Sequence, residues 1–227
     1  VNPMYFGYKI DDNVRPLIQG VAVYPLGEES TLEGGIKPMY FDVTENNGRY
    51  SLKDKNFVYA NGEVAFGIRT FDQVGTSTNN NGPYFYELFL DDELVFQVEA
   101  DSFSYSEPRY VNSLLDYRRY KQKKSSYVRT ETDPFNKLHM IKVRKGTVTV
   151  EEGDTVNVCF KISDYAGNFS TARFKLVGTA PVEVERPQHR RSEYLVMADG
   201  SQNSDITIDD FNVSMEKGTL FRDEWTT

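Results

Sequence analysis

The stretch GEVAFGIRTF (residues 62–71) decides the fold class. Large apolar side chains occupy every second position in its centre, namely Val64, Phe66 and Ile68, with Ala65, Gly67 and Arg69 on the other face. A period of two is the signature of a β-strand, because successive side chains point to opposite faces of a sheet. The stretch therefore predicts a half-buried strand.

Further strands surround it in the sequence. RPLIQGVAVYPL (15–26) predicts one strand, and YFYELFLDDELVFQVEA (84–100) predicts a hairpin that turns at Asp91 and Asp92. Later strand-like segments lie at 138–143, 147–151, 155–164 and 170–177, with the turn DYAGN (164–168) between the last two. Short strands separated by turn residues predict an all-β, Ig-like β-sandwich over residues 14–178.

One segment breaks the β pattern. In SEPRYVNSLLDYRRYKQKK (106–124), Tyr110, Leu114 and Tyr117 recur at helical spacing, and Ser106 and Pro108 suit a helix cap and first turn. We predict one amphipathic α-helix inserted between strands.

The remaining residues flank this domain. Residues 1–13 are interpreted as an exit segment from an upstream domain and 179–187 as a linker. Residues 188–227 predict a C-terminal β segment with too little apolar material for a core of its own. We expect it either to pack on the sandwich or to begin a second small module that continues beyond Thr227. No apolar run reaches the ~18 residues of a transmembrane helix, so no transmembrane segment is expected.

Charge is unevenly distributed. The net charge is −8, but residues 107–145 hold eleven Lys/Arg against four Asp/Glu, which is +7 and leaves −15 for the rest. An acidic body repels nucleic acid and anionic membranes, so neither is an expected partner.

Residues for catalysis are sparse. The two histidines, His139 and His189, lie far apart and form no HxH or HExxH pair, so no zinc site is predicted. His139 is interpreted as a structural or surface residue within a strand. Cys159 lies in an apolar strand and is interpreted as a buried, inert thiol. We expect no catalytic residue, no metal ligand set and no cofactor in this chain.

Two loops carry oxygen ligands that suit calcium. Asp72 with Asn79–Asn81 forms one set, and Asp164 with Asn168 forms the other. Neither has the DxDxDG spacing of a calcium loop, so ordinary solvated loops are the favoured interpretation, and calcium binding stays open.

The basic helix offers a candidate interaction surface, made of Tyr110, Tyr117, Arg118, Arg119, Tyr120 and Lys121. Tyrosines interleaved with cations bind anionic polymers, sugar faces or an acidic neighbouring domain. The favoured interpretation is a solvated helix face, with Tyr110, Leu114 and Tyr117 packing the helix onto the sandwich.

Five stretches together resemble a known family. RPLIQGVAVYPL, GEVAFGIRTFD, YFYELFLDDELVF, RYVNSLLDY and DYAGN resemble, in this order, the region that follows the peptidase domain in exported M23-family (LytM-like) metallopeptidases of Bacteroidetes-type bacteria. RYVNSLLDY is the most distinctive. VNPMYFGY resembles the exit from such a peptidase domain, and KGTLFRDEW resembles the start of the family's next β-module.

The resemblance implies a non-catalytic accessory module of a cell-wall (peptidoglycan) metallopeptidase, exported to the periplasm or cell envelope. The expected partner is the chain's own upstream peptidase domain, whose HxxxD and HxH motifs would hold zinc. The precursor is expected to carry an export signal, and the peptidase domain to end just before Val1. The alternative is a module that binds peptidoglycan or another surface glycan independently.

Overall fold

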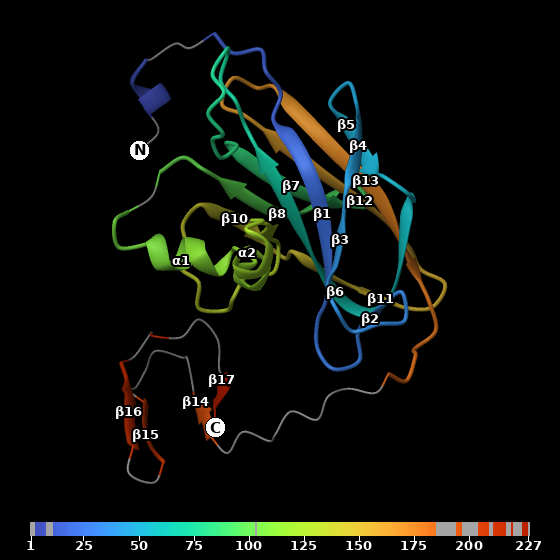
Figure 1. Ribbon diagram of the computed structural model, residues 1–227, viewed down its shortest axis with the longest axis vertical. Helices are drawn as coiled ribbons and strands as arrows, with labels where there is room; N and C mark the ends of the chain where they lie inside the picture. The colour runs from blue at the N-terminus through green and yellow to red at the C-terminus, as the bar shows by residue number, and fades with distance from the viewer. Residues whose placement is uncertain are drawn as a thin grey trace.

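The structure, a computed structural model, describes residues 3–7, 11–102 and 104–184, and shorter pieces further on: 194–196, 204–208, 211–216, 219 and 224–226. Strands dominate the described part of the chain, which forms an all-β sandwich-like fold (Figure 1). The predicted fold class is therefore confirmed.

The sandwich has two layers of strands. One layer contains β1 (Leu17–Pro25), β3 (Met39–Phe41), β9 (Val128–Arg129), β11 (Thr147–Val150) and the second part of β6 (Phe57–Phe71). The other contains β2 (Thr31–Leu32), β4 (Val43–Asn46), β5 (Arg49–Leu52), β7 (Phe85–Leu90), β8 (Glu93–Glu99), β10 (Ile141–Arg144), β12 (Thr155–Ser163) and β13 (Phe169–Gly178).

Strand β6 connects the two layers. Its first residues pair in parallel with β13, and its residues from Val64 onward pair antiparallel with β1. The strand changes partners at Gly62, whose φ is +81°, a conformation that favours glycine. A Cβ at this position would lie 2.6 Å from the Ser30 hydroxyl oxygen. Gly62 thus forms the corner at which one strand passes from one layer to the other.

The stretch that predicted the fold is more buried than its alternation indicates. Residues 64–68 are all buried, so the prediction of a half-buried strand is wrong there. Phe66 faces the core and packs against Phe174, whereas Ala65 and Gly67 lie beneath Tyr24. The second face of β6 is covered because Tyr24 and Tyr127 pack over it.

The predicted hairpin is confirmed. Strands β7 and β8 pair antiparallel, and the turn residues Asp91 and Asp92 have φ values of 46° and 68°. Two positive φ values in succession are typical of a type I′ turn, which matches the twist of the flanking strands. Asp91 is fixed further, since its carboxylate accepts hydrogen bonds from the backbone and the side chain of Asn157.

The helical insertion contains two short helices rather than the single helix predicted. Helix α1 spans Pro108–Ser113 and helix α2 spans Tyr117–Lys123. The helix is interrupted because Leu115 forms a β-bridge with Val128, and because Asp116 takes a non-helical conformation (φ −70°, ψ 81°) as the N-cap of α2. Figure 1 shows both helices together on one side of the sandwich.

Outside the sandwich the structure describes a few further elements. A 3₁₀ turn, η1, spans Pro3–Phe6 in the predicted exit segment. In the C-terminal segment, β14 (Tyr194–Val196) pairs with β17 (Glu224–Thr226), and β15 (Ser204–Ile208) pairs with β16 (Phe211–Met215). Among the described residues, no helix has the length and apolar character needed to span a membrane.

Candidate functional site

A single buried carboxylate anchors the helical insertion to the sandwich. Asp116 is 7% exposed, and one oxygen accepts the backbone N–H of Arg119 at 2.9 Å, which caps α2. The other oxygen accepts the hydroxyls of Tyr24 and Tyr40, at 3.0 and 2.6 Å. Because those tyrosines come from β1 and β3, one side chain fixes the start of α2 to the sheet beneath it.

The tyrosines under the insertion form a small second core. Tyr24 and Tyr127 are buried with Ala22 and Ala65, and the ring of Tyr40 packs edge-on against both tyrosines. Burial, together with the nearby Asp116 carboxylate, raises the pKa of Tyr24 and of Tyr40, so both hydroxyls remain protonated donors. The guanidinium of Arg119 lies 4.1 Å from the centre of the Tyr40 ring.

The outer face of α2 is exposed and carries both rings and cations. Tyr117 and Tyr120 are 65% and 44% exposed, and Arg118 and Lys121 lie beside them at the surface. The ammonium groups of Lys121 and Lys124 lie 5.9 and 5.3 Å from the centres of the Tyr117 and Tyr120 rings. We call Tyr117, Arg118, Tyr120 and Lys121 the α2 face.

A hollow adjoins the α2 face. It has a volume of about 610 Å³ and is lined by Asn112, Ser113, Leu115, Tyr117, Tyr120 and Ser126. Two exposed rings thus border a concavity that also presents hydroxyl and amide groups. Such a combination can stack against a flat ligand face and also hydrogen-bond its polar edge.

The structure divides the six residues predicted from sequence into two groups. The α2 face holds four of them. Tyr110 is half-buried against the main core, and Arg119 lies over Tyr40, so these two contribute to attachment of the insertion. Tyr117 does not help to pack the helix, although its helical spacing from Tyr110 and Leu114 predicted that role.

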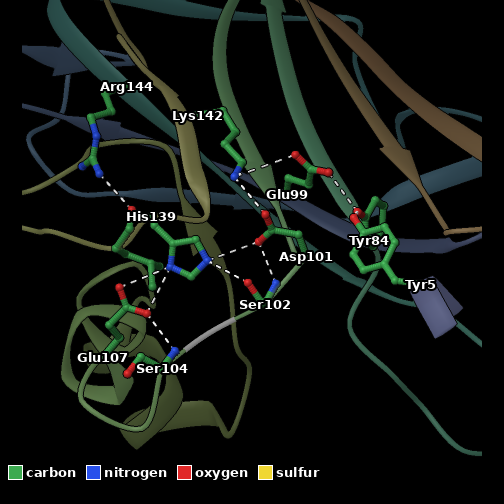
Figure 2. Close-up of polar contacts among 11 residues, drawn as sticks. Tyr5, Tyr84, Glu99, Asp101, Ser102, Ser104, Glu107, His139, Lys142 and Arg144 are labelled. Carbon is green, nitrogen blue, oxygen red and sulfur yellow. Dashed lines mark hydrogen bonds and ion pairs between the residues drawn. The ribbon is translucent and has the colours of Figure 1, made fainter. Parts of the chain in front are cut away.

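A polar network around His139 joins the helical insertion to the layer that contains β8 and β10 (Figure 2). The Nδ1 atom of His139 lies 3.1 Å from a carboxylate oxygen of Glu107, and its Nε2 atom lies 3.2 Å from the Ser102 hydroxyl oxygen and 3.3 Å from Asp101. Lys142 in turn lies 3.0 Å from the other oxygen of Asp101. His139 precedes β10 and is exposed, so its predicted place in a strand is wrong.

The order Ser102, His139, Glu107 is the order of contacts in a nucleophilic triad, and sequence reasoning missed it. In a triad the Nε2 atom must accept the serine proton. Here the same atom also lies 3.3 Å from an Asp101 carboxylate oxygen, so the serine hydroxyl is not its only partner. These contacts favour a structural role, because they link Asp101, Ser102 and Glu107 to His139, and Lys142 of β10 joins the same network.

Cys159 lies on β12 and is half-buried. Burial raises the pKa of its thiol, which keeps the sulfur protonated and weakly nucleophilic.

The two loops considered for calcium meet at one end of the sandwich. Asp72 and Asp164 lie together there with Asp12, which the sequence did not single out.

Comparisons with protein-family models, with curated proteins and with solved structures find no match to this chain.

Proposed function

We propose that this chain is a non-catalytic accessory module of an exported cell-wall metallopeptidase of the M23 type, and that it contacts the peptidase domain through the α2 face. The observation that carries the proposal is the α2 face itself, where two exposed tyrosines and two cations stand on a helix fixed by Asp116. The resemblance of five stretches to the family supplies the rest of the argument.

The attachment of α2 supports a docking role. A protein interface gains affinity when its aromatic and cationic anchors are held in place before binding, since less conformational entropy is then lost. The Asp116 cap and the Tyr24 and Tyr40 hydrogen bonds hold the first turn of α2 in this way. The positive segment 107–145 suits an acidic partner surface.

The first test is the coding sequence upstream of the codon for Val1. The proposal expects an export signal followed by a domain with HxxxD and HxH motifs. An unrelated domain, or a stop codon directly upstream, would contradict it.

The second test measures docking between the separately produced peptidase domain and residues 1–227. We expect the double variant Tyr117→Ala/Arg118→Glu to weaken binding by at least about tenfold, because exposed aromatic and arginine anchors dominate interfaces. Tyr59→Ala/Arg173→Glu is the matched control, since both residues are exposed and lie in the other half of the sandwich fold. Equal binding by both variants would remove the α2 face from the proposal.

A second candidate function is favoured by the hollow beside Tyr117 and Tyr120. In this alternative the module binds a glycan of the cell wall, with a sugar ring stacked on one or both tyrosines. The chain would then sediment with purified peptidoglycan in the absence of any peptidase domain. Tyr117→Ala/Tyr120→Ala would abolish this binding, whereas Arg118→Glu would leave most of it.

A further inference from the structure

Three carboxylates from distant parts of the chain meet at one end of the sandwich. Asp12 precedes β1, Asp72 follows β6, and Asp164 follows β12. One oxygen of each lies within 4.8 Å of the others. Asp72 and Asp164 are 6% and 4% exposed, so this acidic cluster does not belong to an ordinary solvated loop.

One oxygen in the cluster has no partner. The Oδ1 atom of Asp72 is buried and accepts no hydrogen bond from any residue that the structure describes. Its two neighbours accept hydrogen bonds. Asp12 accepts the backbone N–H groups of Val14 and Gly75, and Asp164 accepts the backbone and side-chain N–H groups of Asn168. A buried carboxylate oxygen left without a donor is costly, so Asp72 requires a positive partner or a proton.

Protein cations do not supply that partner in the described part of the chain. No lysine or arginine there forms an ion pair with Asp12, Asp72 or Asp164. Three carboxylates lie close together there, and two of them are buried. The cluster is therefore an electrostatic cost to the folded chain unless a cation binds.

We propose that Asp12, Asp72 and Asp164 bind one calcium ion, with the unpartnered oxygen of Asp72 as one of its ligands. Two oxygens that each lie about 2.4 Å from one calcium ion can be at most about 4.8 Å apart, and the three carboxylate oxygens lie within this limit of one another. All three offered atoms are oxygens, the hard ligands that calcium prefers over nitrogen or sulfur. Backbone carbonyls and water complete its usual six to eight ligands.

The position of the cluster gives the ion a structural role. The ion joins the segment before β1, the loop after β6 and the DYAGN turn between β12 and β13. These three segments are already linked by single hydrogen bonds, such as the one from the Asn168 amide to the Asp12 carbonyl. Calcium would convert weak local contacts into one cross-link at this end of the sandwich.

The test is a titration of calcium chloride into chelator-treated residues 1–227, followed by calorimetry and by thermal unfolding. We expect one ion per chain and an unfolding midpoint that rises by about 5–10 °C when calcium exceeds its dissociation constant about a hundredfold. Asp72→Asn should abolish both effects. Asp92→Asn is the matched control, because it removes one exposed carboxylate in the β7–β8 turn and should retain both effects.

The Asp72→Asn variant also distinguishes a cluster that binds calcium from an acidic cluster that binds no ion. If the cluster binds no ion, this substitution removes a repulsive charge, so it stabilises the chain equally with and without calcium. That result, or the absence of a calcium-dependent midpoint shift in the wild-type chain at millimolar calcium, overturns the proposal. Magnesium at the same concentration should give a smaller shift, because it retains its water ligands more strongly.

Discussion

At the scale of single residues, Asp116 determines whether the insertion is attached. Its two oxygens satisfy a helix N-terminus and two tyrosine hydroxyls, and its own backbone N–H donates to the Tyr127 carbonyl. The sequence suggested none of these partners, because Tyr24 lies 92 residues away and Tyr40 lies 76 residues away. For the same reason, the sequence could not show that a cap residue would divide the predicted helix in two.

The Asp116→Ala variant tests this anchor. It removes the cap of α2 and leaves two tyrosine hydroxyls without their acceptor, so we expect a loss of about 2–4 kcal/mol in the free energy of unfolding. Tyr117→Ala, one position along and exposed, should change that free energy by no more than about 0.5 kcal/mol. Urea unfolding of both variants measures the difference. Similar values for the two would show that Asp116 is not the anchor.

At the scale of elements, sequence patterns predicted what depends on neighbours in the chain. Alternation identified β6, and the pair Asp91–Asp92 identified the β7–β8 turn. The same patterns could not show that both faces of residues 64–68 are covered, because that cover comes from Tyr24 and Tyr127, which are distant in the sequence. Nor could the patterns predict that Asp12, Asp72 and Asp164 lie close together, since these residues meet only when the strands beside them are in register.

The corner in β6 gives a prediction at this scale. Gly62→Ala places a Cβ at a φ of +81° and 2.6 Å from the Ser30 hydroxyl oxygen, so strain and a steric clash add. We expect a loss of about 2 kcal/mol or more in the free energy of unfolding. Gly153 is the control, because its φ is +91° and a Cβ there would meet no other atom within 4 Å. Gly153→Ala therefore introduces backbone strain without a steric clash. Denaturant unfolding should show Gly62→Ala to be the more destabilising of the two.

At the scale of the whole molecule, charge and shape are organised together. Most of the chain carries −15, whereas segment 107–145 carries +7 and includes both helices of the insertion. This segregation follows from counting residues in the sequence. What the count could not show is that Asp116 and Arg119 face inward while Tyr117, Arg118, Tyr120 and Lys121 form the exposed α2 face.

Salt distinguishes the two kinds of partner proposed for the α2 face. Contacts between exposed charges are screened beyond about 8 Å at physiological ionic strength, whereas stacking of a tyrosine on a sugar is not. If the partner is an acidic peptidase domain, affinity should fall steadily as sodium chloride is raised. Arg118→Ala should then flatten this dependence, and Tyr117→Ala should lower the affinity while leaving the slope unchanged. A glycan partner would give affinities that hardly change with salt in all three chains. Binding measured by calorimetry over a salt series decides between these outcomes. The change in affinity with salt concentration measures the contribution of the cations, and the affinity that remains at high salt measures the contribution of the tyrosine rings.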